Sequence, residues 1–281
     1  MSASMRLRPD GSLHLHHGPI DCILRAWGAD DELRAAYAQV ATVFPAMLPE
    51  LCAELPTLRL PAGPHLAGQV AQRMRAACLP FAAAHFITPM AAVAGAVADH
   101  LLAALCAGRT LDRAFVNDGG DIAFHLAPGA TLACGLVSDL DAPGLDGRFT
   151  LAHDNKARGL ATSGAGGRSF SLGIADSVTV LAENAAAADA AATLVANAVD
   201  LPGHAAIRRV PARTLDPDSD LGDRMVTRQV GRLSPPEITR ALAPGRAMAA
   251  RLHQAGAIHA AVLSLRGRFA TIGLPPHALA A

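Results

Sequence analysis

Residues Ala114–Leu126 read AFVNDGGDIAFHL and indicate the fold class more clearly than any other stretch. Two runs of strand length, Ala114–Asn117 and Asp121–Leu126, flank the adjacent glycines Gly119 and Gly120. β-Branched and aromatic residues favour strands, and paired glycines adopt the positive φ angles that tight hairpin turns require. The pattern predicts two antiparallel strands in the middle of the chain.

More strands are expected on both sides of this hairpin. Residues 5–25 read as three short strands, with a turn at Pro9-Asp10-Gly11 and Pro19 opening the third. Later strands are predicted at residues 131–137, 149–152, 159–162 and 169–181, and a closing hairpin is predicted around Arg266-Gly267.

Helical segments separate these groups of strands. They are predicted at residues 30–43, 65–78, 88–106 and 184–197, and after Ser234, where Glu237 completes capping-box spacing. Pro45 and Pro49 are expected to interrupt the chain after the first helix, because proline removes a helical N–H donor. Together the segments predict an α+β fold, with helices packed on a mostly antiparallel sheet in a single domain over residues 1–281.

Composition excludes several classes of protein. Half of the 281 residues are hydrophobic (51%), which is enough for a large core and argues against disorder. The net charge of zero gives no basic surface, so no nucleic acid partner is expected. The longest apolar run, Phe86–Ala98, is too short to span a bilayer, and the N-terminus lacks a signal peptide's apolar region. The five cysteines form no CxxC pair and indicate buried, reduced thiols in the cytoplasm.

Three segments carry candidate binding residues. In the first, Asn117, Gly119, Gly120 and Asp121 combine a glycine turn with side-chain acceptors for ribose hydroxyls or a cation, and Asp118 adds another acceptor. An ordinary hairpin turn would have the same pattern.

The second segment is the glycine-rich loop that follows residue 159. Its candidate ligand residues are Thr162, Ser163, Gly164 and Arg168, since loop N–H groups and an arginine can bind a phosphate. A surface loop without a ligand is the alternative.

In the third segment, Asp189 and Thr193 lie four residues apart on a predicted helix and could coordinate Mg²⁺ through oxygen. A solvated helix surface is the alternative there.

Histidines form a further group of candidates. His14 and His16 share one strand face and His17 points to the other, so a metal site or a solvated strand edge would both fit. His85 and His125 are the candidate general bases. No catalytic residue is assigned.

In this order, the three segments resemble the ApbE-like superfamily, whose best-known members are FAD:protein FMN transferases. The glycine turn is similar to that family's N-x-GGD element, residues 161–164 to its A-T-S-G element, and residues 188–193 to its A-D-x-x-x-T element, which supplies Mg²⁺ ligands. The helix at residues 94–99 resembles its G-x-x-x-D element. The runs HHGPID, FITPMAAVAGAVAD, GRSFSLGIADSVTVLA and LDPDSDLGDR are similar to an uncharacterised bacterial and archaeal branch.

The resemblance implies a T-fold-like architecture and a Mg²⁺-dependent transferase or hydrolase acting on a flavin- or nucleotide-like small molecule, with FAD or FMN as ligand. By analogy it also suggests a homodimer. The family's histidine and D-P-x-T-G run are missing, because the comparable stretch is Ser171–Asp176. Classical FMN transfer is therefore not expected. The alternatives are an enzyme of another heterocyclic cofactor's biosynthesis, pterin-like for example, and a non-catalytic ligand-binding protein.

Overall fold

A computed structural model of the chain describes residues 2–61, 63–136, 147–167 and 169–274. They group into two compact units. The first comprises Met1–Ala133, Thr150–Ala161 and Ala182–Asp189, and the second comprises Cys134–Phe149, Thr162–Leu181 and Ala190–Ala281. The expectation of a single domain stays a prediction, and the two units are described separately below.

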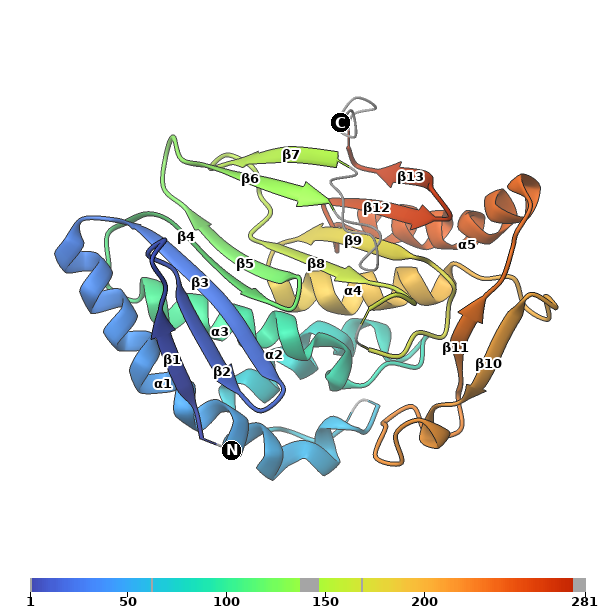
Figure 1. Cartoon of the computed structure of the whole chain (residues 1–281), viewed down its shortest axis with the longest axis horizontal. Coiled ribbons are helices and arrows are strands. Elements are labelled where there is room, and N and C mark those ends of the chain that lie inside the picture. The colour runs from blue at the N-terminus through green and yellow to red at the C-terminus, as the bar shows by residue number, and fades with distance from the viewer. Residues whose placement is uncertain (1, 62, 137–146, 168, 275–281) are drawn as a thin grey trace. The chain divides into compact units, whose positions relative to one another are not determined.

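Antiparallel strands form one layer of the first unit (Figure 1). The strands follow the order β1 (Ser4–Leu7), β2 (Leu13–His17), β3 (Ile20–Gly28), β4 (Leu111–Asp118) and β5 (Asp121–Leu126), and β5 pairs with the start of β8 (Gly159–Ser163). The turns are those expected at residues 8–12, at residues 18–19 and at the paired glycines. The order follows the sequence because each pair of successive strands up to β5 is joined by a hairpin or by a helical segment.

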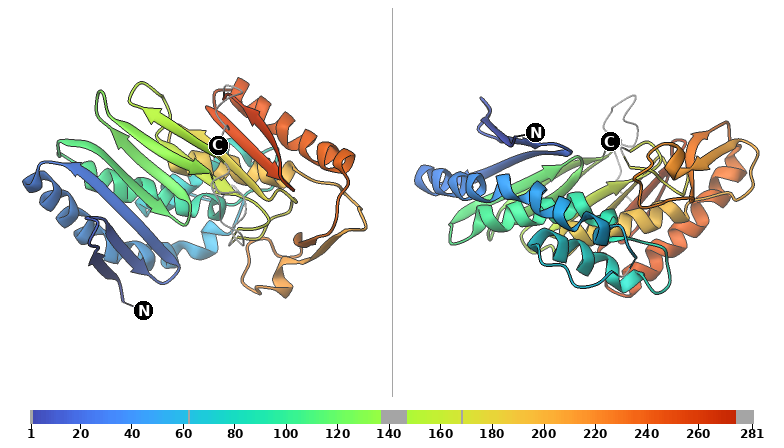
Figure 2. Two further views of the ribbon diagram at one scale, coloured as in Figure 1. Left: turned by 45° about the horizontal axis from the view of Figure 1, so that its top comes forward. Right: turned by 90° about the horizontal axis from the view of Figure 1, so that it is seen from below.

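Helices cover one face of this sheet (Figure 2). They are α1 (Asp30–Leu58), α2 (Gln69–Cys78) and α3 (Val93–Cys106), the last preceded by a 3-10 turn at Pro89–Ala92. Alternate residues of β3, including Cys22 and Leu24, are fully buried on the helix side. The other face carries Arg25 and Trp27, which keep partial exposure. One face of the sheet therefore contributes to the core, and the opposite face is less covered.

The prediction that Pro45 and Pro49 end the first helical segment is wrong. α1 continues to Leu58 through both prolines and through Pro56. All three prolines are exposed, whereas Phe44 and other core residues of α1 are buried. Carbonyl groups that lose a partner on the exposed face remain accessible to water, and burial of the opposite face holds the helix together.

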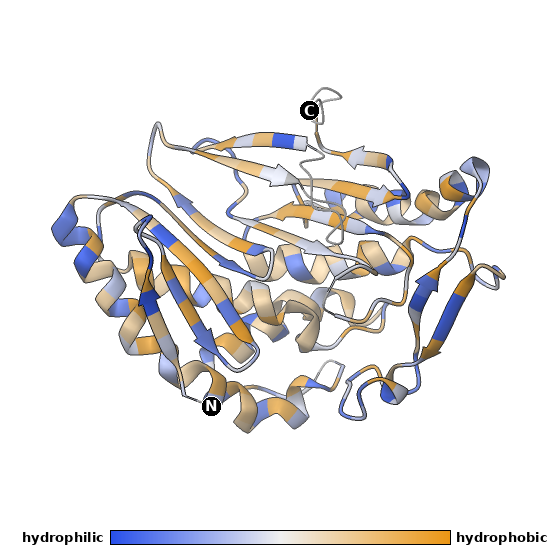
Figure 3. Ribbon diagram, in the orientation of Figure 1, coloured by the Kyte–Doolittle hydropathy of each residue, from blue (hydrophilic) through white to orange (hydrophobic). Residues whose placement is uncertain are grey.

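The second unit has its own strands and a long helix. β12 (Ala260–Leu265) lies between β9 (Ser177–Ala182) and β13 (Arg268–Ile272), and all three are antiparallel. α5 (Pro235–Gln254) begins at the predicted capping box and packs on β12 and β13. A separate ribbon of β10 (Ile207–Pro211) and β11 (Met225–Val230) was not expected from the sequence. It carries several charged side chains, which appear as blue segments in Figure 3.

Residues 169–176 were expected to be a strand and are not one. Their backbone bonds instead to the end of α4 (Ala185–Ala198): Leu172 N–H donates to the Asn197 side chain, and Ile174 N–H donates to the Val199 carbonyl. A Cβ atom on Gly173 would lie 2.1 Å from the Ala196 carbonyl oxygen, so the loop requires glycine at this close approach.

Five elements have residues in both units. They are β8, β9, α4 and the strands β6 (Thr131–Leu136) and β7 (Gly147–Ala152), the last two of which pair with each other. By length and composition, the stretch Pro89–Cys106 is apolar enough to cross a membrane, but half of it is buried inside the protein, as in a core helix.

Candidate functional site

A two-residue turn joins β4 to β5 and fixes the first candidate segment. Gly119 and Gly120 have φ angles of 65° and 113°. The Asn117 side-chain oxygen accepts a hydrogen bond from the Gly120 N–H at 2.8 Å. Asp118 and Asp121 are directly paired across the two strands. The segment is therefore the tight hairpin that its sequence allowed, and the hairpin sets two carboxyl groups opposite each other.

These carboxyl groups meet a third one from α4. Asp118 and Asp121 are buried, with 4% and 8% of their surface exposed. The Asp189 side chain is hydrogen-bonded to Asp121, interacts electrostatically with Asp118, and accepts the Gly95 N–H at 3.1 Å. We refer to Asp118, Asp121 and Asp189 as the carboxyl cluster. All three residues belong to the first unit.

The cluster changes the acidity of Asp189. Burial, followed by the charge of Asp121, raises the pKa of the Asp189 carboxyl well above its ordinary value, and the Gly95 N–H opposes this only in part. Since neighbouring carboxylates repel each other, this pair favours a state in which one of its two members carries a proton.

The carboxyl oxygens have the chemistry of a Mg²⁺ site, since Mg²⁺ prefers oxygen ligands and usually retains water or ligand oxygens. Within the described part of the chain, no three His, Cys, Asp or Glu side chains are already arranged to hold a metal ion. A metal ion at the cluster would therefore replace the proton of the carboxyl pair and take its remaining ligands from water or from a bound molecule.

Backbone contacts and a buried carboxylate fix the start of α4. The two Asp99 carboxyl oxygens accept the N–H groups of Ala185 and Ala186 at 3.0 and 2.9 Å, and the Asn184 side chain accepts that of Ala187 at 2.8 Å. Burial raises the pKa of the Asp99 carboxyl, although these N–H groups oppose the shift. Since the first N–H groups of the helix are already bonded, this helix end does not bind a phosphate in the present arrangement.

Two glycines let the backbone approach α4 closely. A Cβ atom on Gly95 of α3 would lie 2.3 Å from the Ala185 carbonyl oxygen, and one on Gly159 of β8 would lie 2.0 Å from the Asn184 carbonyl carbon. Both distances are too short for any side chain to fit. The contacts bring the Gly95 N–H within reach of Asp189, so these glycines help to place the carboxyl cluster.

Thr193 follows Asp189 by four residues on α4, so helix geometry puts both side chains on one side of the helix. Thr193 is partly exposed and belongs to the second unit. Its role as a metal ligand stays a prediction, and the third member of the carboxyl cluster is Asp118. Sequence reasoning named Asp118 only as an acceptor. The sequence signal that could have placed Asp118 beside Asp121 is the two-residue turn, because such a turn pairs the residues on either side of it.

The glycine-rich loop lies in the second unit. Thr162 is exposed, Ser163 is partly exposed, and the Thr162 hydroxyl lies 2.9 Å from that of Thr179. A Cβ atom on Gly164 would lie 2.4 Å from the Asp176 carbonyl oxygen, so this glycine serves chain packing. Arg168 lies outside the described residues.

Part of the loop's hydrogen-bonding capacity is already used. The Ala165 N–H donates to the Ala175 carbonyl, and the Gly167 N–H donates to the Gly164 carbonyl. These two groups are not available to an anion in this conformation. The Asp176 carboxylate accepts the backbone N–H of Arg266, so it fixes the β12–β13 turn.

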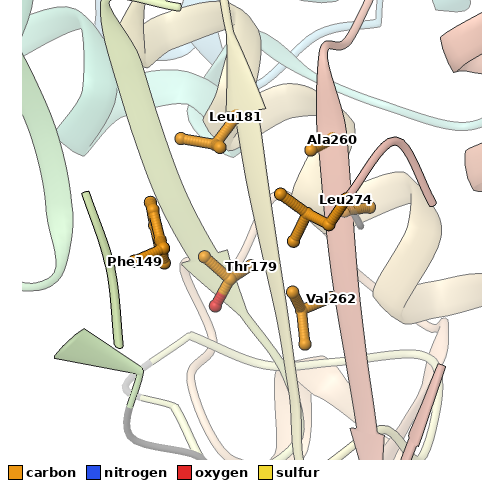
Figure 4. Close-up of a pocket in the computed structure, with 7 residues that line it drawn as sticks. Phe149, Thr179, Leu181, Ala260, Val262 and Leu274 are labelled. Atoms are coloured by element: carbon orange, nitrogen blue, oxygen red, sulfur yellow. The ribbon is translucent and has the colours of Figure 1, made fainter. Parts of the chain in front are cut away.

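A small apolar pocket lies on the face of β9 and β12 in the second unit (Figure 4). It holds roughly 170 Å³ of space, open solvent included, and is lined by Phe149, Thr179, Leu181, Ala260, Ala261, Val262 and Leu274. The Thr179 hydroxyl, which interacts with Thr162, is the polar group drawn at its wall. This contact brings one predicted ligand residue, Thr162, to the border of the pocket.

The histidines are dispersed. His14 lies 2.6 Å from the Asp21 carboxylate and His16 lies 4.0 Å from it, on the exposed side of the β2–β3 hairpin. As expected, His17 points to the other side, where it is buried against Phe44. The His125 ring bonds to the Leu111 carbonyl at 3.2 Å. That contact gives His125 a structural partner.

Lys156, the only lysine in the sequence, is exposed on the surface. The cysteines are free, but Cys52 is exposed and Cys106 is half-buried, so the expectation of burial fails for these two.

Comparisons with known proteins agree with this architecture. The family model described as "AbpE bacteria" matches residues 4–271. A UPF0280 protein of Methanopyrus kandleri is 40% identical over 131 residues, which cover 47% of this chain and 49% of that protein. A UPF0280 protein of Methanobrevibacter smithii is 37% identical over 112 residues, covering 40% and 46%. The chain thus matches about half the length of these curated relatives.

A solved structure is similar over almost the whole chain. The ApbE protein of Thermotoga maritima superposes with a TM-score of 0.53 and covers 95% of this chain and 96% of its own, at 12% sequence identity. At that identity the likeness concerns the fold alone. It confirms the expected α+β architecture of antiparallel strands and packed helices.

Proposed function

The chain belongs to the family described as AbpE bacteria, and from that premise we propose that it is a Mg²⁺-dependent cytoplasmic enzyme acting on a flavin- or nucleotide-like molecule. Its reaction would be a transfer or a hydrolysis. FAD is the first ligand to test, because the resemblance to flavin transferases motivates it.

One arrangement carries the proposal: the Asp121 and Asp189 carboxyl groups meet beside Asp118, and burial together with the Asp121 charge raises the pKa of Asp189. Three carboxyl groups this close cannot all ionise without a counter-charge. A divalent cation supplies that counter-charge and removes the need for the proton. The cluster therefore has the electrostatic properties of a cation site.

The residues around the cluster have separate expected roles. Asp189 and Asp121 would bind Mg²⁺ in the first unit, and Thr193 is the further oxygen ligand suggested by the sequence. The Asn117 side-chain oxygen is engaged with Gly120, so its NH₂ group remains free to donate to a ligand. Bound Mg²⁺ neutralises developing negative charge on phosphate oxygens.

Contacts to the rest of the ligand are proposed from sequence. Thr162, Ser163, Gly164 and Arg168 would contact its phosphate or carboxylate, and Gly119 and Gly120 allow its close approach at the hairpin. Classical FMN transfer is not part of the proposal. The stretch Ser171–Asp176 stands in place of the family's missing run, and its Asp176 is bonded to Arg266. The absence of the family's histidine and D-P-x-T-G run motivates a second candidate, an enzyme that uses the same fold on another heterocycle, pterin-like for example.

The test is an absorbance spectrum of the purified protein, followed by FAD titration with and without Mg²⁺. We expect saturable binding that needs Mg²⁺ and is lost in Asp189→Asn. Asp112→Asn, an exposed aspartate of the same unit, is the matched control and should bind like wild type. Equal FAD binding by Asp189→Asn and wild type would refute the metal role. An absence of FAD binding in either buffer would turn the search to other heterocycles.

A further inference from the structure

The less covered face of the first unit's sheet carries two arginine side chains that stack on one tryptophan. The guanidinium carbon of Arg25 lies 4.7 Å from the Trp27 ring centroid, and that of Arg113 lies 4.2 Å from it. Trp27 and Arg113 are directly paired across β3 and β4. We call these three residues the arginine–tryptophan patch.

The two charges lack an acidic partner. Among the residues that the structure describes, neither arginine forms an ion pair within 4.0 Å, although Arg109, Arg209 and Arg213 each do. Asp10 senses the charge of Arg25, but its carboxylate is bonded to Ser12. Two guanidinium groups held close together without a counter-charge repel each other, so an anion between them would be stabilised.

The geometry of the patch suits an oxyanion. Stacking on an indole fixes a guanidinium group while leaving the N–H groups at its edge free to donate. Arg113 uses one nitrogen to bond the Thr131 carbonyl at 3.1 Å, which fixes its orientation further. The two centroid distances put the guanidinium carbons at most about 9 Å apart, so the patch concentrates two positive charges beside one ring. A phosphate group can accept paired hydrogen bonds from a guanidinium group.

The patch is separate from the carboxyl cluster. Arg25 and Trp27 lie on the less covered face of β3, whereas Asp118 and Asp121 are buried on the helix-covered side of the same sheet. Arg113 lies five residues before Asp118 on β4, about 16 Å along an extended strand. A ligand at the carboxyl cluster therefore does not explain the patch.

We propose that Arg25, Trp27 and Arg113 form a second binding site, for the phosphate group of a small phosphorylated ligand. The proposal does not depend on the function proposed above. Phosphate would accept hydrogen bonds from the guanidinium groups of the patch, with Trp27 holding them in place.

The chain offers a direct readout, because Trp27 is its only tryptophan. Its fluorescence, excited at a wavelength that tyrosine does not absorb, would be followed while inorganic phosphate, and separately pyrophosphate, is added at constant ionic strength. We expect a saturable change, and at least a tenfold weaker affinity in both Arg25→Gln and Arg113→Gln. Arg34→Gln, which removes an exposed arginine of the same unit, should respond like wild type.

Three outcomes would overturn the proposal. They are a response that sodium chloride reproduces, a saturable response that survives in the double Arg25→Gln/Arg113→Gln variant, and a response to a single-stranded oligonucleotide but to neither phosphate probe. Far-ultraviolet circular dichroism would verify that each variant is folded. Both arginines are partly exposed, so these substitutions should leave the core intact.

Discussion

Replacing Asp99 with alanine tests whether a side chain of α3 holds the first turn of α4. The two Asp99 oxygens accept the N–H groups of Ala185 and Ala186 at 3.0 and 2.9 Å in a buried place. A hydrogen bond to a charged group contributes about 1.5–3 kcal/mol, and Asp99→Ala leaves two buried donors without partners.

Part of that loss is offset, because removal of Asp99 also removes the cost of burying a carboxylate, which is the main cause of its raised pKa. We therefore expect a net loss of about 2–4 kcal/mol in the free energy of unfolding. For a domain of this size, the melting temperature should fall by roughly 4–15 °C.

The assay is thermal unfolding by circular dichroism, combined with hydrogen exchange of the amides at the start of α4. Exchange should become faster at residues 185–188 and stay unchanged in α5. Asp99→Asn keeps one acceptor oxygen and should lose about half as much stability. Asp112→Ala removes an exposed carboxylate and serves as the control. A melting temperature of Asp99→Ala within about 1 °C of wild type, with unchanged exchange, would show that the buried cap contributes nothing.

Three further predictions concern packing, protonation and thiol reactivity. Gly95→Ala should cost about 1–3 kcal/mol of stability in chemical denaturation, because its Cβ would lie 2.3 Å from a carbonyl oxygen of α4. Gly166→Ala should cost far less, because its Cβ would lie 3.6 Å from the Asp176 carbonyl oxygen. In metal-free buffer, the folded protein keeps a proton on Asp189 above the pH at which the unfolded chain loses it, because the pKa of Asp189 is raised by folding. This carboxyl group therefore favours the folded state at low pH, and its contribution to stability falls as the pH rises through the raised pKa. Melting curves from pH 4 to pH 8 should show Asp189→Asn gaining stability relative to wild type, and a constant difference would contradict the raised pKa. In the native protein, Cys52 should react with iodoacetamide well before Cys134, which is buried and has a pKa raised by burial to about 11; equal rates would argue against the described burial.

Local sequence signals predicted much of the fold. The paired glycines of the β4–β5 turn, the capping box of α5 and the turn at Arg266-Gly267 all lie where the pattern placed them. These features depend on a few neighbouring residues, so they can be recognised without the rest of the chain.

Features set by distant contacts could not be predicted in the same way. α1 continues through its prolines because its opposite face is buried, and residues 169–176 bond to the end of α4 and form no strand. The candidate site shows the same limit. Asp121 and Asp189 were singled out by motif, but the meeting of Asp118, Asp121 and Asp189 depends on how the start of α4 packs against Gly95.

The close approach of Gly95 and Gly159 to the start of α4 restricts how this site can change during evolution. The spacing there is set by backbone touching backbone, with no side chain between them. At the majority of helix contacts, the exchange of one apolar residue for another can adjust the spacing. Such exchanges are excluded at Gly95 and Gly159. New specificity would have to arise from the β4–β5 turn or from loops elsewhere, while the start of α4 stays constant.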